Sequence, residues 1–162
     1  MSGHVIRKAK IPDVPELQRL INSFADRGAM LPRALNTIYE SLRDFVVVED
    51  GGRITGCCAL HVTWDDLAEI KSLAVDEGAQ GIGLGQKLVQ TCLSEARDMG
   101  IPKVFALTYV PGFFEKLGFV RVDKSALPHK IWSECINCPK FPDCGEEAVE
   151  IDTHNSTLNT QN

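Results

Sequence analysis

One stretch, Ala68–Glu95, constrains the fold more than any other part of the chain. Its sequence, AEIKSLAVDEGAQGIGLGQKLVQTCLSE, reads as an apolar strand, a polar bend, a glycine-rich turn and then a long amphipathic helix. Glycines in the turn remove side chains, so backbone N–H groups can converge on an anion, and the positive end of the following helix adds to the attraction. The stretch therefore predicts a strand–turn–helix unit that binds phosphate.

The spacing of the glycines separates three kinds of phosphate-binding turn. A dinucleotide fingerprint has the form G-x-G-x-x-G with an acidic residue about 20 positions on, whereas this turn is G-x-G-x-G and Glu95 lies inside the expected helix. A Walker A loop needs Gly-Lys-Ser/Thr, which Gln86-Lys87-Leu88 does not match. The pattern Q-x-x-G-x-G from Gln80 to Gly85 resembles the acetyl-CoA signature of the GCN5-related N-acetyltransferases, the GNAT family. A tight turn whose glycines serve packing alone is the alternative.

Composition narrows the class of protein. A length of 162 residues fits one domain, and 44% hydrophobic residues suffice for a sizeable core. No apolar run approaches the roughly 20 residues of a membrane span, and the N-terminus lacks the apolar segment of a signal peptide, so we expect a cytoplasmic protein without membrane contact. A formal net charge of -5 argues against nucleic-acid binding. Small molecules are the expected partners, and a homodimer is an open alternative.

Strand and helix periodicities alternate along the chain. We expect strands at Val5–Ala9, 45–48, Ile54–Val62, Leu67–Val75, Val104–Thr108 and Phe119–Val122. We expect helices at Asp13–Asp26, Ala34–Arg43, from the glycine turn to Gly100, and at Gly112–Lys116.

Two of these elements have a predicted geometry. Asp50-Gly51-Gly52 predicts a hairpin turn, and Val104–Thr108 is expected to lie parallel to Leu67–Val75 as a βαβ unit. Strict alternation along Leu67–Val75 places Glu69, Lys71, Leu73 and Val75 on one face.

The end of the chain is less regular. We expect one domain over residues 1–149, which includes a segment rich in cysteine and proline at 126–147, and a polar, disordered tail at 150–162. Cys135, Cys138 and Cys144 form a C-x₂-C-x₅-C run, and C-x-x-C is a common zinc knuckle. Since the run lacks a clear fourth ligand, we favour reduced thiols over a structural zinc, with a Cys138–Cys144 disulfide as a third alternative.

The order of expected elements resembles the GNAT fold over Val5–Asp123. The resemblance implies an α/β (α+β) architecture with a mixed central sheet flanked by helices. A second motif, FEKLGF at Phe114–Phe119, is similar to the family's Y-E-K-x-G-F segment. Shorter segments are similar to the acetyltransferase domain of N-acetylglutamate synthases, and these are GCCAL from Gly56, AEI from Ala68, LAV from Leu73, FALT from Phe105 and LP from Leu127. Those synthases usually carry an amino-acid-kinase domain ahead of this one, whereas only a few residues precede the first expected strand here, so we expect a short, kinase-less synthase in which arginine feedback is in doubt.

Acetyl-CoA is the cosubstrate that the resemblance implies. In the family the strand splays at the position of Leu73, where a backbone N–H meets the thioester oxygen, and the N–H at Val75 helps to hold the pantetheine arm. The expected cofactor-binding residues are Leu73, Ala74, Val75, Gln80, Gly81, Ile82, Gly83, Leu84, Gly85, Gln86 and Phe114.

Acetyl transfer to an amine needs a neutral amine, a polarised carbonyl and protonation of the leaving thiolate. Glu69 is the expected general base, since its offset from Gln80 resembles that of the catalytic glutamate in related acetyltransferases; a salt-bridged carboxylate is the alternative. Leu73 would act through its backbone. The family's acidic tyrosine is replaced here by Phe114, so Tyr109 is the candidate acid, with a packing role as the alternative.

Cationic side chains are needed if the acceptor is a dicarboxylate. Arg33 is the first candidate because it follows Leu31-Pro32 at the start of the second helix, and Lys71 and Lys130 are further candidates. The leading hypothesis is an N-acetyltransferase that acts on the α-amine of L-glutamate in the first step of arginine biosynthesis. The alternatives are a GNAT enzyme for another small amine or a protein, and a non-catalytic acyl-CoA-binding protein.

Overall fold

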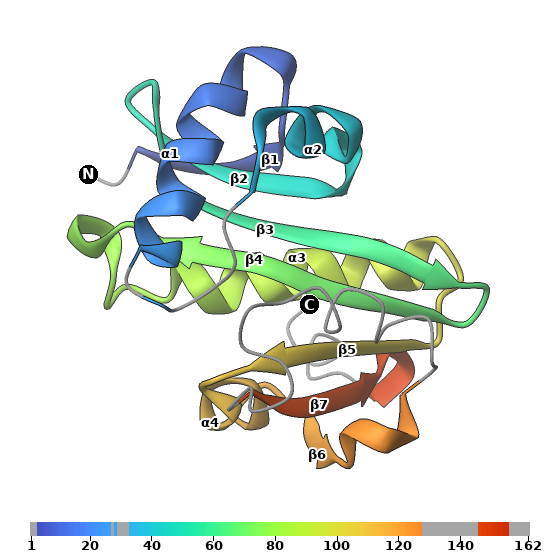
Figure 1. The fold of residues 1–162 in the computed structure, drawn as a ribbon. Coiled ribbons are helices and arrows are strands. Elements are labelled where there is room, and N and C mark those ends of the chain that lie inside the picture. The colour runs from blue at the N-terminus through green and yellow to red at the C-terminus, as the bar shows by residue number, and fades with distance from the viewer. Residues whose placement is uncertain (1–2, 27, 29–32, 128–145, 156–162) are drawn as a thin grey trace.

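The structure of this protein is a computed structural model that describes residues 3–26, 28, 33–127 and 146–155. These residues form a seven-stranded sheet in the order β1-β2-β3-β4-β5-β7-β6, with helices on both faces (Figure 1). The strands are β1 (His4–Lys8), β2 (Phe45–Asp50), β3 (Arg53–Trp64), β4 (Leu67–Val75), β5 (Lys103–Thr108), β6 (Val120–Val122) and β7 (Glu147–Asp152). Only β4 and β5 pair in parallel, so the predicted mixed sheet with flanking helices is confirmed.

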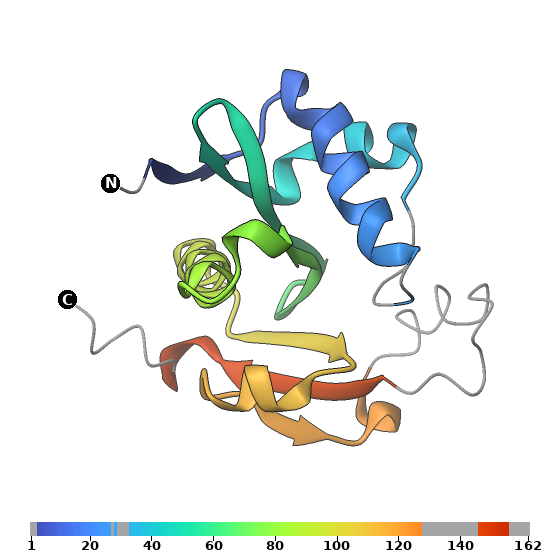
Figure 2. The ribbon, with the colours of Figure 1, turned by 90° about the vertical axis from the view of Figure 1, so that its left-hand side faces the viewer.

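The helices divide into two layers on the two faces of the sheet (Figure 2). They are α1 (Val14–Ala25), α2 (Leu35–Glu40), α3 (Leu84–Asp98) and α4 (Pro111–Glu115), with short 3₁₀ turns η1 (Ile11–Asp13), η2 (Leu42–Asp44), η3 (Glu77–Ala79), η4 (Lys124–Ala126) and η6 (Thr153–Asn155). No helix in the described ranges is long and apolar enough to cross a membrane.

Each helical layer buries one apolar stripe. The α1 side chains Val14, Leu17, Leu20 and Ile21 pack with Ile38 of α2 on one face of the sheet. Helix α3 covers the other face with its buried stripe of Leu84, Leu88, Val89, Cys92, Leu93 and Ala96. The period of about 3.6 residues in both stripes is what places one apolar face of each helix on the sheet.

The hairpin between β2 and β3 follows the sequence prediction. Gly51 and Gly52 have φ of 59° and 84°, the left-handed values that a two-residue hairpin turn requires. The pairing then shifts by one residue: Glu49 faces Ile54, but Val48 faces Gly56. This bulge changes which residues of β3 share a face with β2.

The predicted strict alternation along β4 is wrong, because the strand contains a second bulge. The pairing changes between Cys57–Ala74 and Ala59–Lys71, and Ser72 adopts a φ of 54°. Before the bulge Ile70 faces α3, and after it Leu73 packs on that same side. Leu73 therefore lies on the opposite face of the sheet from Glu69. The neighbour of Glu69 on β5 is Phe105, which belongs to a different hydrophobic cluster from Ile70 and Leu73.

A buried thiol supports the bulge in β4. The Cys57 Sγ donates a hydrogen bond of 3.2 Å to the carbonyl oxygen of Ser72. Burial raises the pKa of the Cys57 thiol to about 12, so the sulfur keeps the proton that this bond needs.

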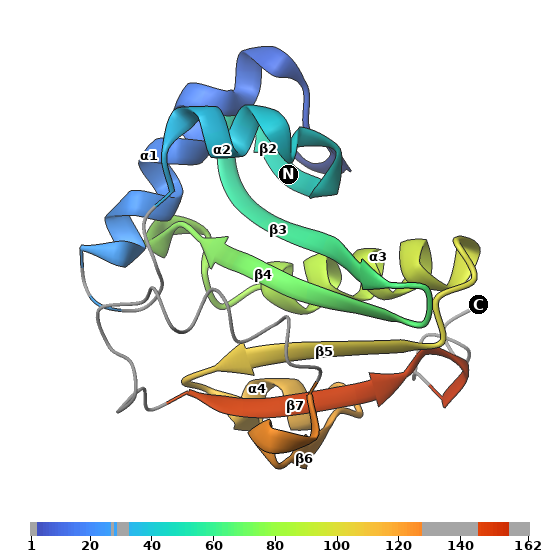
Figure 3. The same ribbon diagram turned by 45° about the vertical axis from the view of Figure 1, so that its right-hand side comes forward.

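The bulge coincides with the separation of β4 from β5. The two strands pair in parallel only as far as Ile70 and Ala106, although β4 runs on to Val75 and β5 to Thr108. Figure 3 shows the two strands moving apart toward their carboxyl ends. The splay that the family resemblance implied at Leu73 is thus present in the backbone.

The expected boundary of the folded domain at residue 149 is also corrected. Residues 147–152 form β7, which lies between β5 and β6 and pairs antiparallel with both. Its Ala148, Val149 and Ile151 are buried, and the Thr153 Oγ1 donates a hydrogen bond of 2.9 Å to the Ile101 carbonyl. Residues 150–155, expected in a disordered tail, therefore belong to the sheet and to η6.

Candidate active site

The glycine turn joins the end of β4 to the start of α3, as the sequence predicted. Gly81 and Gly83 have φ of 88° and 82°, and Gly83 is the N-cap of α3. The Gln80 side chain donates a hydrogen bond of 2.9 Å to the Val75 carbonyl, which ties the turn to the strand end.

Packing does not explain the glycines of this turn. A Cβ at Gly81 or Gly83 would meet no atom of the described residues within 4 Å. Their positive φ requires glycine, and no described side chain caps the N-terminus of α3, where the first N–H groups have no partner within the helix. An exposed turn with these N–H groups and the positive end of a 15-residue helix fits a phosphate group.

Apolar side chains lie beside this turn on the α3 face of the sheet. Leu73, Val75 and Phe113 are half-buried against the α3-side core. The ring of Phe113 would lie 3.5 Å from a Cβ at Gly85, so it borders the first turn of α3. Phe114, which the sequence favoured as a cofactor contact, is 3% exposed and packs edge-to-face between Phe113 and Phe119. Sequence reasoning missed Phe113 because the family motif directs attention to its neighbour.

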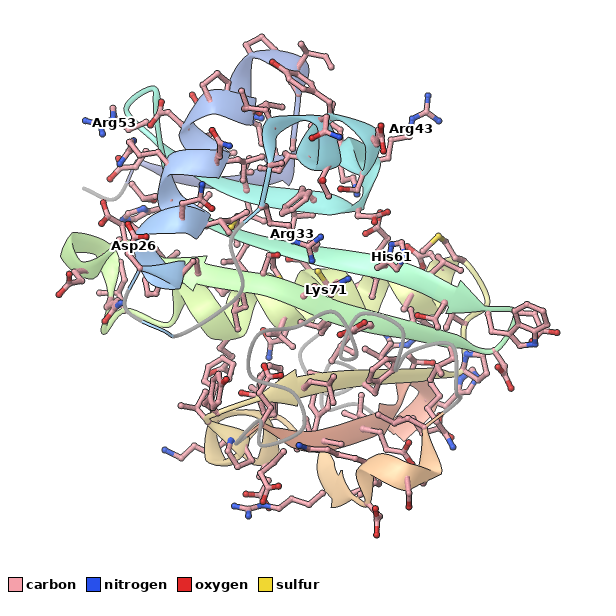
Figure 4. The ribbon with its side chains drawn as sticks, viewed as in Figure 1. Asp26, Arg33, Arg43, Arg53, His61 and Lys71 are labelled. Carbon is pink, nitrogen blue, oxygen red and sulfur yellow. The ribbon has the colours of Figure 1, made fainter. Side chains whose placement is uncertain are left out.

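A pocket of about 280 Å³ lies on the opposite face, near the bulge in β4. Three of its side chains are basic, and Figure 4 shows them close together between α2 and β4. The lining residues are Arg33, Thr37, Glu40, Ser41, Asp44, Phe45, Ala59, His61 and Lys71. The pocket therefore brings together two of the three predicted substrate-binding residues, Arg33 and Lys71.

Side chains of α1 hold the backbone of Arg33 at the pocket. The Arg33 N–H donates a hydrogen bond of 3.0 Å to the Asn22 Oδ1, and its carbonyl accepts one of 3.2 Å from the Gln18 Nε2. Because α1 is anchored in the core, these two bonds position Arg33 relative to the sheet.

Glu69 lies two residues before Lys71 on β4 and opposite His61 on β3. The His61 Nδ1 lies 2.8 Å from the Asp44 Oδ2. This hydrogen bond raises the pKa of His61, and the negative charges of Asp44 and Glu69 act in the same direction, while partial burial and Lys71 act against it. Sequence reasoning missed His61 and Asp44. Their proximity follows from the register of the β2–β3 hairpin, and the bulge near Thr55 shifts this register by one residue from the one that the turn predicts.

Of the remaining predicted site residues, the structure describes Tyr109 but not Lys130 or the three cysteines. Tyr109 follows β5 directly and is 38% exposed. Lys130 and the cysteines Cys135, Cys138 and Cys144 lie outside the described residues. Within the described ranges, no three His, Cys, Asp or Glu side chains are grouped so that they could hold a metal ion.

Comparison with known protein families gives a match over most of the chain. The model of the Acetyltransferase (GNAT) family matches residues 13–119. Among curated proteins, the chain is 38% identical over 144 residues to an uncharacterized N-acetyltransferase of Chlorobaculum tepidum, which covers 89% of this chain and 93% of that protein. It is 36% identical over 133 residues to an amino-acid acetyltransferase of Mycobacterium tuberculosis, covering 80% of this chain and 76% of that protein.

Solved structures give a similar result. The N-acetylglutamate synthase of Neisseria gonorrhoeae, solved with coenzyme A and N-acetyl-glutamate, superposes with a TM-score of 0.86 at 26% identity, over 96% of this chain and 36% of that one. A Mycobacterium tuberculosis protein solved in complex with CoA has a TM-score of 0.79 at 31% identity, over 91% of this chain and 98% of that one. The chain thus spans about a third of the Neisseria synthase.

Proposed function

The chain belongs to the GNAT acetyltransferase family and is an acetyl-CoA-dependent N-acetyltransferase, and we propose that it acetylates the α-amine of an amino acid, L-glutamate. Two of the similar proteins support this acceptor: one is named an amino-acid acetyltransferase, and the other is a synthase solved with N-acetyl-glutamate. With glutamate as acceptor, the reaction is the first step of arginine biosynthesis. A cytoplasmic location stays a prediction from the sequence.

The observation that supports the proposal is the pair of cationic side chains, Arg33 and Lys71, in the pocket next to the splay in β4. Glutamate presents two carboxylates, and Arg33 and Lys71 line the same pocket of about 280 Å³. Arginine suits a carboxylate through two parallel hydrogen bonds, and lysine acts as a point charge. Although Glu40 and Asp44 also line the pocket, these two cations provide a partner for each carboxylate of a small dicarboxylate, and this supports glutamate as the acceptor.

Acetyl-CoA would lie along the other parts of the site. Backbone N–H groups of the turn at 80–86 would hold its phosphates, and the strand end from Leu73 to Val75 would hold the pantetheine arm. Since β5 no longer pairs with β4 beyond Ile70, backbone groups of β4 become available to a ligand at this point.

We propose the following chemical role for each residue. Glu69 takes a proton from the acceptor ammonium, and the neutral amine attacks the thioester carbonyl. The Leu73 N–H donates to the oxygen that gains negative charge. Because this donor is a backbone group, the assignment does not depend on the face to which the Leu73 side chain points. Tyr109 is the proposed acid that protonates the thiolate.

The experiment that tests the acceptor is a CoA-release assay over a panel of amino acids. We expect glutamate to give a kcat/KM well above those of aspartate, glutamine and lysine, and the product to be N-acetyl-glutamate by mass spectrometry. If another amino acid gives a higher kcat/KM, that amino acid and not glutamate is the acceptor. CoA release without any active acceptor would contradict it.

A further inference from the structure

A histidine–aspartate pair lies at the edge of the acceptor pocket. His61 comes from β3 and Asp44 from η2, just before β2, and both line the pocket. Their 2.8 Å hydrogen bond joins the His61 Nδ1 to the Asp44 Oδ2. An aspartate in this position holds the proton on Nδ1 and leaves Nε2 to accept a proton.

The pair is also next to the proposed general base. His61 and Glu69 are direct partners in the antiparallel pairing of β3 and β4. Side chains of such partners stand on the same face of a sheet, with Cβ atoms about 4.5–5.5 Å apart. The His61 side chain lines the pocket and is also 50% exposed to solvent.

Charged groups from several elements lie near the imidazole. Asp44 of η2 and Glu69 and Lys71 of β4 act on its charge. Glu40 of α2 and Arg33 line the same pocket. The hydrogen bond that the His61 imidazole donates to the Asp44 carboxylate is the largest influence, and it raises the pKa of His61 above its ordinary value. An imidazole accepts a proton from a carboxylic acid because its pKa lies above that of a carboxyl group, and it can release the proton to water.

We propose that His61, held by Asp44, is the proton relay of the acceptor site, which carries the substrate's proton from Glu69 to solvent. This inference rests on the proposed function, in which Glu69 is the base. In the relay, the ammonium N–H bond breaks and its proton moves to the Glu69 carboxylate. The proton then passes to the His61 Nε2 and forms an imidazolium that Asp44 stabilises. Loss of the same proton to water restores the neutral imidazole, so the relay needs no other reactant.

Two positions test the relay directly by NMR titration of the His61 imidazole. We expect the pKa of His61 to fall in Asp44→Asn, which removes the paired charge, and to fall by a smaller amount in Glu69→Gln. This measurement needs no acceptor and therefore stands apart from the identity of the substrate. An unchanged pKa of His61 in Glu69→Gln would overturn the relay, because the two groups would not interact.

Kinetics test the same step in turnover. In His61→Gln we expect kcat to fall about 10- to 100-fold at neutral pH, with the affinity for acetyl-CoA unchanged. The wild-type kcat should rise with pH through the measured pKa of His61, since only the neutral imidazole accepts a proton, and in Asp44→Asn this rise should move to lower pH. A matched control is His4→Gln, because His4 lies 3.7 Å from Asp50 in another histidine–aspartate pair on β1 and β2.

The outcomes separate this inference from the proposed function. If another amino acid is the true acceptor, glutamate is rejected but the pH profile with that acceptor still tests the relay. If His61→Gln keeps the wild-type kcat and pH profile, the relay is wrong while the proposed function stands. If no amino acid is acetylated, the proposed function fails, and the relay is rejected with it.

Discussion

At Gly83 the chain adopts a φ of 82° at the start of α3, where the expected phosphate site lies. We expect Gly83→Val to abolish acetyl-CoA binding, because a β-branched residue disfavours this conformation and its side chain would occupy the space above the N–H groups. Isothermal titration with acetyl-CoA measures the effect. Gly100→Val is a matched control, since Gly100 has a φ of 81° and also an open Cβ position, but follows α3. Equal affinities in the two variants would contradict the phosphate assignment.

Glu69 is the residue on which the proposed chemistry depends. We expect Glu69→Gln to lower kcat by roughly 10²–10⁴-fold, the usual range for a general base, with a much smaller change in acetyl-CoA affinity. Raising the pH should restore part of the activity because more of the acceptor amine is then neutral. Steady-state kinetics between neutral and alkaline pH give the measurement, and near-normal turnover at neutral pH would make Glu69 a structural residue.

Arg33 is expected to contribute to acceptor binding alone. Arg33→Ala should lower kcat/KM for glutamate by about 10- to 100-fold, since a charge-assisted hydrogen bond contributes roughly 1.5–3 kcal/mol. Arg43→Ala is the matched control, because Arg43 is exposed and its side chain points away from the pocket (Figure 4). Acetyl-CoA affinity should stay unchanged in both variants; a parallel loss of both substrates in Arg33→Ala would indicate a role in folding.

Among single residues, those with a strong local signal could be predicted and those placed by irregular pairing could not. The glycines at 81 and 83 have a conformation that follows from their residue type. The register that brings His61 near Asp44 includes a bulge at Thr55, and the only local signal for it is Gly56 within the strand, which does not by itself give the register. Leu73 was assigned to the wrong face for the same reason, since Ser72 is not a residue that commonly takes a positive φ.

At the scale of the elements, the bulge in β4 determines where the strand separates from β5. We expect Ser72→Val to lower the free energy of unfolding by about 1–3 kcal/mol, the range for a strained backbone position, and also to lower kcat, because the bulge orients the Leu73 N–H. Ser72→Gly, which suits a positive φ, should keep both quantities near the wild type. Urea denaturation and steady-state kinetics measure them. Similar losses in both variants would mean that the serine hydroxyl, and not the backbone, is what matters.

Most elements were predicted from periodicity, and the exception is informative. The hairpin, the βαβ unit and the stripe of α3 each carry a signal within a short window of sequence. Strand β7 was missed because its sequence EAVEID has three acidic residues in six, and it follows a segment rich in cysteine and proline. Its buried Val149 and Ile151 find their partners on β5 and β6, which are distant in sequence.

At the scale of the whole molecule, β7 completes the sheet. Truncation after Glu146 would remove the strand between β5 and β6 and uncover Val104 and Phe105, which are fully buried. We expect this variant to lose cooperative thermal unfolding and to bind a hydrophobic dye, whereas truncation after Asn155 should behave as the full chain, because it keeps all the described strands. Circular dichroism with dye fluorescence gives the comparison. A cooperative transition after truncation at Glu146 would mean that β7 is dispensable.

The place of β7 has a consequence for the order of events during synthesis. β1 to β5 can pair as soon as they leave the ribosome, because each neighbour in that part of the sheet is already present. β6 emerges next, and among the described strands its partner is β7, which follows later. Until then the edge of β5 is open, and such edges pair readily with other chains. A nascent chain that pauses before residue 147 is therefore expected to be a chaperone client.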